Sequence, residues 1–208
     1  MLRKIRSFDI LVVVVQFTYI KNLRGYVMRL YKNIYDSDFL EKFNSKRKEI
    51  EQIELIDNKI DVDKIAGILG LRINYSDIEH SGKISNNEIL VNEYESKNRQ
   101  RFTIAHEIGH FIFDHGESLR TIHEEQYKNI IEKTNEIVAN NFAANLLMPK
   151  NLVLELLVDN LKKLGYDVTE EFDNDVEKKL VQSVADTLNV SSQALSYQID
   201  NLDLFTRE

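Results

Sequence analysis

Residues 106–110 read His-Glu-Ile-Gly-His, an HExxH pattern whose spacing is meaningful only on a helix. Side chains four residues apart lie one above the other on a helix face, so both imidazoles reach a single Zn²⁺ at about 2.0–2.1 Å. Glu107 lies at the edge of that face, where it can hold a water molecule and accept its proton. The spacing therefore predicts a metal site on a helix, with His106 and His110 as ligands and Glu107 as the base.

The flanking residues favour the helix that this motif needs. Apolar residues at helical spacing predict a buried stripe beside the histidine face, formed by Ile104, Ile108, Phe111 and Ile112. Gly109 costs such a helix about 1 kcal/mol relative to alanine. We therefore expect a neighbouring element to pass Gly109 too closely for a Cβ atom.

A second predicted helix supplies a third ligand, which a catalytic zinc site requires in addition to an open position. The stretch from Thr134 to Leu147 reads as a helix, with Thr134 as its N-cap and Glu136 in its first turn. Glu136 shares a face with small residues such as Ala139, which would let this helix approach Gly109. The sequence thus predicts a His₂Glu site completed by Glu136.

The composition is that of an ordinary globular chain. Its 208 residues favour one domain, or one with a small appendage, and 43% are hydrophobic and 29% charged. Cysteine is absent, so a metal must use nitrogen and oxygen ligands, and a cytoplasmic location is expected. The formal net charge of −7 argues against a nucleic-acid coat protein.

Two blocks of the sequence resemble the ImmA/IrrE family of metallo-endopeptidases. The first is residues 102–110 and the second is residues 136–149, and weaker similarity at residues 65–73, 89–92 and 185–195 extends it over roughly residues 60–202. The resemblance implies an α+β, predominantly helical fold. It would comprise a zincin-like minimal metalloprotease core with a small β-sheet, followed by a C-terminal helical segment like a helix-turn-helix.

The same resemblance implies a function. It implies a zinc-dependent endopeptidase whose protein substrate is a helix-turn-helix repressor, and whose cut derepresses a mobile-element or stress-response regulon. A non-catalytic zinc-fold interaction module, such as a toxin–antitoxin component, is the alternative, although the presence of three ligands and a base favours an enzyme. Neither membrane contact nor direct nucleic-acid binding is expected, because residues 191–200 contain no Lys or Arg to meet phosphates.

We expect three segments along the chain. Residues 1–37 form an N-terminal extension whose structure the sequence leaves open, residues 38–149 the metallopeptidase core, and residues 150–208 a helical segment packed on the core. The apolar run in the extension resembles a signal peptide, but Asp9 and Gln16 interrupt it and it is too short to span a membrane. A strand over residues 11–17 is favoured, with targeting and a true start at Met28 as alternatives.

Other patterns predict the remaining elements. We expect an amphipathic helix over residues 38–55, a helix from Asp61 to Leu69 ended by Gly70, a strand over 71–75, a loop or hairpin over 76–87 and a strand over 89–92. Helices are expected over residues 151–164, 175–188 and 191–202. We hypothesise that the strand over 89–92 is an exposed edge to which substrate backbone adds.

Several further residues are candidates for supporting roles. An oxyanion in peptide hydrolysis needs a stabilising donor, and the candidates are Tyr94, His115, His123 and Tyr127. Zinc histidines are commonly oriented by a hydrogen bond to their other ring nitrogen, for which Asp114 and Asn140 are candidates.

Overall fold

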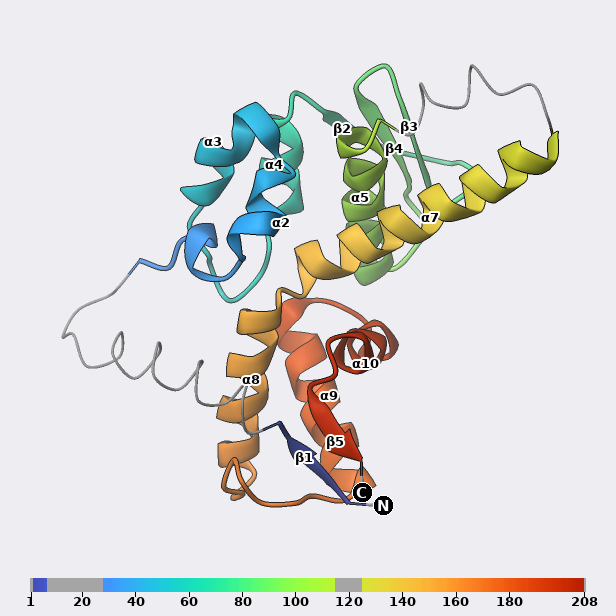
Figure 1. Ribbon diagram of the computed structural model, residues 1–208. Coiled ribbons are helices and arrows are strands. Elements are labelled where there is room, and N and C mark those ends of the chain that lie inside the picture. The colour runs from blue at the N-terminus through green and yellow to red at the C-terminus, as the bar shows by residue number, and fades with distance from the viewer. Residues whose placement is uncertain (1, 7–27, 115–124, 208) are drawn as a thin grey trace. The chain divides into compact units, whose positions relative to one another are not determined.

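The computed structural model of the protein describes residues 2–6, 28–114 and 125–207 (Figure 1). These residues form two compact units: one from Met1–Asp36, Ile53–Lys59 and Met148–Glu208, the other from Ser37–Gln52 and Ile60–Leu147. The strand predicted over residues 11–17 lies outside the described residues. Within the described ranges, no helix has both the length and the apolar character that crossing a membrane requires.

The second unit contains a three-stranded sheet in the order β2-β4-β3. Strand β2 (Arg72–Ser76) runs parallel to β4 (Glu88–Asn92), and β3 (Gly82–Ser85) pairs antiparallel with β4. Asn86 and Asn87 connect β3 to β4 with φ angles of 50° and 60°, as a tight two-residue hairpin turn requires. Of the predicted loop or hairpin over residues 76–87, residues 77–81 are therefore a loop, and residues 82–87 are the first strand and the turn of a hairpin.

This strand order shows that the edge-strand hypothesis for residues 89–92 is wrong. Strand β4 lies at the centre of the sheet and is paired on both sides, so no substrate strand can add to it. Ile89 and Val91 are fully buried. Their apolar alternation indicates a buried face and carries no information on whether a strand is central or at an edge. The edges are β2 and β3.

Helices α5 (Lys97–Ile112) and α7 (Glu125–Leu147) pack against each other, and α5 also contacts β3 and β4. The predicted HExxH helix is confirmed as α5, which begins where the Ser96 hydroxyl accepts the Arg99 amide. The predicted start of α7 at Thr134 is wrong, because the helix already includes Glu125, the first residue described after Asp114. The Thr134 hydroxyl instead donates to the Ile130 carbonyl at 2.8 Å, an arrangement that satisfies threonine inside a helix.

The amphipathic helix predicted over residues 38–55 is interrupted. It consists of α2 (Ser37–Glu41), the 3₁₀ turn η2 (Asn44–Lys46) and α3 (Arg47–Glu51), and Asn44 has a φ of 50° at the break. Its apolar stripe is nevertheless buried, and the ring of Phe39 stacks on Phe142 of α7. Helix α4 (Val62–Ile68) begins as predicted at Asp61, whose carboxylate accepts the Lys64 amide at 2.9 Å.

The first unit joins both described ends of the chain. Strand β1 (Arg3–Ile5) pairs antiparallel with β5 (Phe205–Arg207), and η1 (Tyr31–Asn33) is a short 3₁₀ turn. Helices α8 (Lys150–Lys163), α9 (Asn174–Leu188) and α10 (Ser192–Asn201) match the three predicted C-terminal helices. Ser191 caps α10 directly after α9 ends at a left-handed Asn189, which confirms the predicted short connection.

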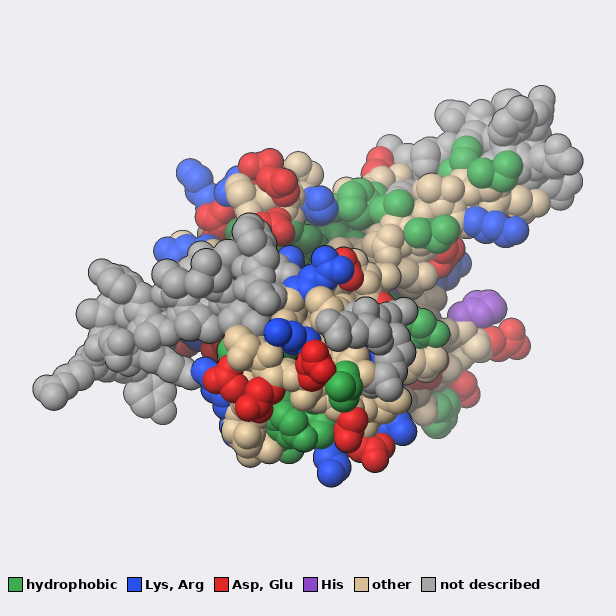
Figure 2. Space-filling view, turned by 60° about the horizontal axis from the view of Figure 1, so that its bottom comes forward, with side chains coloured by type: hydrophobic (Ala, Val, Ile, Leu, Met, Phe, Trp, Pro, Cys, Tyr) green, Lys and Arg blue, Asp and Glu red, His purple; other side chains and the backbone are tan. Residues whose placement is uncertain are grey.

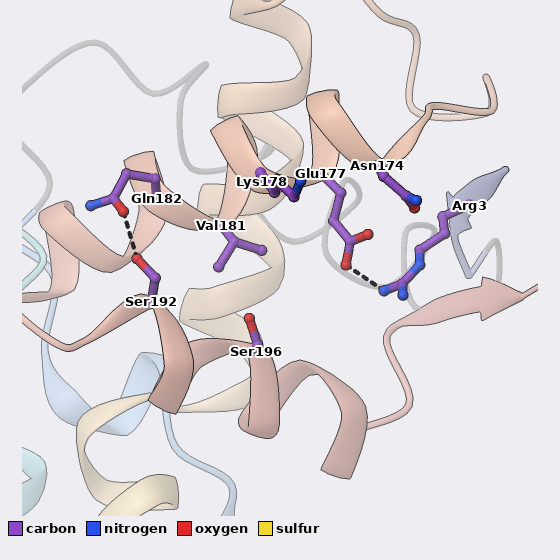
Figure 3. Close-up of a pocket in the computed structure, with 8 residues that line it drawn as sticks. All are labelled: Arg3, Asn174, Glu177, Lys178, Val181, Gln182, Ser192 and Ser196. Carbon is purple, nitrogen blue, oxygen red and sulfur yellow. Dashed lines mark hydrogen bonds and ion pairs between the residues drawn. The ribbon is translucent and has the colours of Figure 1, made fainter. Parts of the chain in front are cut away.

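A pocket of about 420 Å³ lies within the first unit, where α9, α10 and β1 meet (Figure 3). The Arg3 guanidinium donates to Glu177 there, and the Ser192 hydroxyl donates to Gln182 at 2.8 Å. Several of its polar groups therefore satisfy one another.

Acidic and basic side chains are interspersed on the face shown in Figure 2, as expected for a chain with a net charge of only −7. The predominantly helical α+β fold is confirmed. The division into segments 1–37, 38–149 and 150–208 stays a prediction of domain organisation.

Candidate metal centre

His106 and His110 project from one face of α5. Their Nε2 atoms lie 3.0 Å apart and their ring centroids 4.6 Å apart. Both side chains are mostly buried, with exposed fractions of 16% and 15%. The spacing of four residues therefore brings the two nitrogens to one point, as predicted.

Glu136 reaches this point from α7. Its Oε2 lies 3.3 Å from Nε2 of His106 and its Oε1 lies 3.2 Å from Nε2 of His110. The two helices approach closely at Gly109, where an added Cβ would lie 3.1 Å from Phe142 Cδ1 and 3.2 Å from Ala139 Cα. The predicted reason for a glycine at this position is confirmed.

The three side chains fit a tetrahedral metal ion. Two ligands of a tetrahedral zinc ion lie roughly 3.3 Å apart when each bond is about 2.0–2.1 Å long. The observed separations of 3.0, 3.2 and 3.3 Å are close to this value. Among the described residues, His106, His110 and Glu136 form the group of side chains that could hold a metal ion, and two imidazoles with one carboxylate suit zinc.

Asn140 of α7 orients one of the histidines. Nδ1 of His106 donates to Oδ1 of Asn140 at 3.0 Å, which leaves the Nε2 lone pair directed at the candidate metal position. Burial lowers the pKa of His106, whereas the charge of Glu136 and the bond to Asn140 act in the opposite direction. Asp114, the other predicted orienting residue, follows α5 with a φ of 52°, and no contact within the described residues joins it to either histidine.

Glu107 lies beside the candidate metal ligands, on the side of α5 that faces β3. Its side chain is buried and accepts a hydrogen bond from the backbone amide of Ile84 in β3. Burial raises the pKa of Glu107 to about 7, the charge of Glu136 adds to the rise, and the Ile84 amide opposes it. Glu107 thus lines the same pocket as His106 and Glu136.

This pocket has a volume of about 260 Å³ and lies between α5, α7 and the start of β3. Ser81 and Gly82 line it from the sheet, and Arg99 lines it from the first turn of α5. A Cβ on Gly82 would collide with Thr103 of α5, so the glycine allows β3 to lie against the helix. None of these three residues was predicted from the sequence to lie at the site. Helical spacing could have placed Arg99 at the site, because Arg99 lies seven residues before His106 and therefore on the same helix face.

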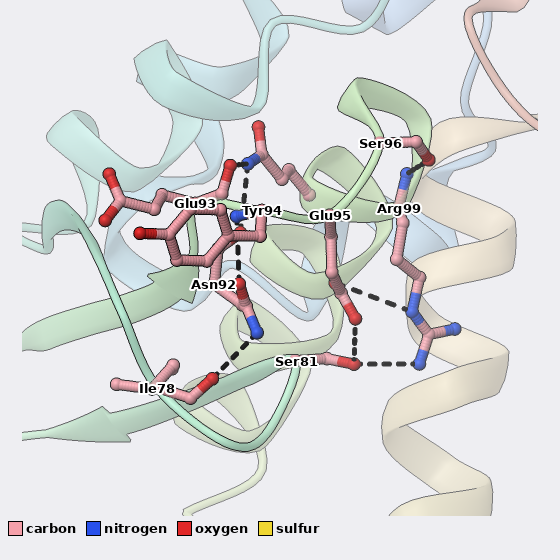
Figure 4. A network of polar contacts seen from close by, with 9 residues as sticks. Ile78, Ser81, Asn92, Glu93, Tyr94, Glu95, Ser96 and Arg99 are labelled. Carbon is pink, nitrogen blue, oxygen red and sulfur yellow. Dashed lines mark hydrogen bonds and ion pairs between the residues drawn. The ribbon is translucent and has the colours of Figure 1, made fainter.

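Of the residues predicted to stabilise an oxyanion, Tyr94 is the one whose side chain the structure describes, and it does not line the pocket. Tyr94 is 74% exposed and is not among the residues that line the pocket. It lies in a network after β4, where its amide donates to Oδ1 of Asn92 at 2.9 Å (Figure 4). His115, His123 and the side chain of Tyr127 lie outside the described residues.

The chain is similar in sequence to known metalloproteases. A peptidase-family model described as an IrrE N-terminal-like domain matches residues 67–200, a range that includes all four predicted site residues. The radiation response metalloprotease IrrE of Deinococcus radiodurans is 39% identical over 90 residues, which cover 43% of this chain and 26% of that protein. The protein of the same description from Deinococcus deserti is 40% identical over 70 residues, or 33% and 25% of the two chains. The chain therefore matches about a quarter of the length of these curated relatives.

Proposed function

The chain belongs to the IrrE N-terminal-like family of metallopeptidases, and from this premise we propose that it is a zinc-dependent endopeptidase. The observation that carries the proposal is the convergence of α5 and α7 on one point. Ligand atoms of His106, His110 and Glu136 all lie within 4.8 Å of one another, and Glu107 lines the same pocket.

Each of these side chains has a separate task in peptide hydrolysis. His106, His110 and Glu136 would hold the ion, and three protein ligands leave a fourth position for substrate or water. When bound, zinc polarises the scissile carbonyl and lowers the pKa of a water molecule toward neutrality. Glu107 accepts the proton of the attacking water and passes it to the leaving amine nitrogen. The amide of Ile84 and the side chain of Asn140 keep Glu107 and His106 in the required orientations.

The proposed substrate is a helix-turn-helix transcriptional repressor in the cytoplasm. Its cleavage would derepress a mobile-element or stress-response regulon. Both relatives are described as radiation response metalloproteases, which supports a role in a stress response.

The experiment that tests the function compares wild type with Glu107→Gln, using a purified helix-turn-helix repressor as the substrate. We expect Glu107→Gln to retain zinc and to cut at least about 10²-fold more slowly, because the base is lost while the ligands remain. Glu79→Gln is the matched control, since Glu79 is exposed and does not line the pocket. A Glu107→Gln variant that cuts at the wild-type rate would contradict the mechanism.

The same experiment addresses the alternative function. If wild type and Glu107→Gln both bind the repressor tightly and neither cuts it, the protein acts as a non-catalytic interaction module. Zinc stoichiometry after Glu136→Ala tests the third ligand separately, and we expect that variant to lose most of its bound zinc.

A further inference from the structure

Arg99 lies on the same face of α5 as the two histidines. Arg99, Thr103, His106 and His110 follow one another at intervals of four, three and four residues, which keeps them in line along the helix. Arg99 and His106 both line the metal-site pocket. Seven helical residues span about 10 Å, which is the length of about three residues of an extended peptide.

Two residues outside α5, Ser81 and Glu95, contact the Arg99 guanidinium, as Figure 4 shows. Its Nη2 donates to Oγ of Ser81 at 3.2 Å, and its Nε lies 3.8 Å from Oε2 of Glu95. The Ser81 hydroxyl donates in turn to Oε1 of Glu95 at 2.7 Å. Ser81 precedes β3 and Glu95 precedes α5, so this is a clamp between segments rather than an ion pair along one helix. A side chain held in this way loses little further freedom when it binds a ligand.

The clamp leaves part of the guanidinium free to bind. The Arg99 side chain is 57% exposed, and its Nη1 has no hydrogen-bond partner among the described residues. The planar guanidinium presents its donors as a fork that matches the two oxygens of a carboxylate. Among the described residues that line the pocket, Arg99 is the one with a permanent positive charge, while Glu107 and Glu136 are acidic. The pocket thus has acidic groups at the metal position and a cation two helical turns away.

We propose that Arg99 is a specificity-determining residue that binds an acidic side chain of the substrate, Asp or Glu, about two to three residues from the bond that is cut. This inference rests on the proposed function, because it takes the metal position as the place of cleavage. A purely structural Arg99 would only join Ser81 and Glu95 and would not distinguish an acid from its amide.

The test uses tripeptide hydroxamates, which bind a metal ion through the hydroxamate and place peptide residues along the pocket. One series carries the hydroxamate at the C-terminus and the other at the N-terminus, and each has Asp or Asn at the second or third residue from it. Calorimetry on the zinc-loaded full chain gives the affinities for wild type, Arg99→Gln, Arg99→Lys and Arg72→Gln. Arg72 is an exposed arginine of β2 outside the pocket and serves as the matched control.

We expect one Asp-containing probe to bind wild type about fivefold more tightly than its Asn counterpart, the scale of a partly exposed ion pair. Arg99→Gln should remove this preference and leave the affinity for the Asn probe unchanged. Arg99→Lys should keep part of the preference because it keeps the charge but loses the fork. Arg72→Gln should behave as wild type.

Two results would overturn the inference while leaving the proposed function intact. One is equal binding of every Asp and Asn pair by wild type. The other is an Arg99→Gln variant that weakens Asp and Asn probes by the same factor, which a structural clamp would produce. Two other results would contradict the proposed function itself. Either neither series binds the zinc-loaded protein, or the affinity is the same after zinc is removed. Either result would also overturn the inference about Arg99.

Discussion

Gly109 brings α5 and α7 close enough for Glu136 to reach both histidines. The atoms that an added Cβ would meet there include the Cα and carbonyl oxygen of Ala139, at 3.2 and 3.3 Å. Backbone atoms of a packed helix cannot rotate away as a side chain can. The geometry of the candidate site therefore depends on Gly109, although Gly109 contributes no ligand. Substitution by alanine, which adds one methyl group, tests this dependence.

We expect Gly109→Ala to destabilise the protein. Alanine gains about 1 kcal/mol of helix propensity, but overpacking a close contact costs about 1–3 kcal/mol. The displaced α7 should also weaken zinc binding, by about tenfold, since Glu136 moves with it. Thermal unfolding and competition with a chelator measure the two effects. Gly67→Ala in α4 is the control, because nothing lies within 4 Å of the added Cβ there and the substitution should be neutral or stabilising.

A second prediction concerns the hydrogen bond between Asn140 and His106. Asn140→Ala removes the acceptor at Nδ1 of His106, so we expect zinc affinity to fall by about 10–100-fold with little change in fold. Asn140→Asp keeps an acceptor oxygen and should retain most of the affinity. Equal zinc affinity for the alanine variant and wild type, measured by chelator competition, would show that Asn140 does not orient the ligand.

Among the elements, the sheet order decides which strand is the edge, and it is not the strand over residues 89–92 that we expected. Strand β4 is central and bonded on both sides, whereas β3 is an edge whose Ile84 amide points to Glu107. Proline removes a backbone donor, so its effect depends on where that donor points. A proline in a central strand should therefore lower the stability of the protein more than a proline in an edge strand.

We expect Val91→Pro to lower the stability of the protein severely, by about 3 kcal/mol or more. The substitution removes a ladder donor and a fully buried side chain at the centre of the sheet. Ile84→Pro should be tolerated far better, because the Ile84 amide bonds the Glu107 carboxylate and not a neighbouring strand. Thermal unfolding compares the two, and similar losses for both variants would contradict the assignment of β3 as the free edge.

At the scale of the whole molecule, the candidate metal site lies entirely within the unit formed by Ser37–Gln52 and Ile60–Leu147. The ion would tie α5 to α7, which are separated in sequence by residues 113–124. A ligand that binds only the folded state stabilises it by about 4 kcal/mol when its concentration is a thousandfold above its dissociation constant.

We therefore expect zinc to slow amide hydrogen exchange in α5 and α7 of the metal-free protein. Helices α9 and α10 belong to the other unit and are the internal reference, in which exchange should change little. Mass spectrometry of exchanged peptides measures both regions in one sample. The effect should be absent in Glu136→Ala, and equal protection in all four helices would contradict a site confined to one unit.

The local patterns in the sequence were sufficient to predict much of the site. The histidine pair, the buried face of α5 and the close approach at Gly109 follow from the period of an α-helix, which acts over a few residues. The cap at Asp61 was likewise predictable, because a cap is a contact between near neighbours in the sequence. Thr134 is not a cap, because a threonine hydroxyl can be satisfied inside a helix as well as at its start.

From the sequence alone we predicted the candidate ligands His106, His110 and Glu136 and the candidate base Glu107, using spacing, residue type and resemblance. Only the tertiary structure decided that β4 is central, that Ile84 holds Glu107, and that Ser81 and Glu95 hold Arg99 at the pocket. The physical reason is the range of the interactions. Helix periodicity places side chains along one short segment, whereas strand order and contacts between segments depend on how distant parts of the chain pack, which no local pattern specifies.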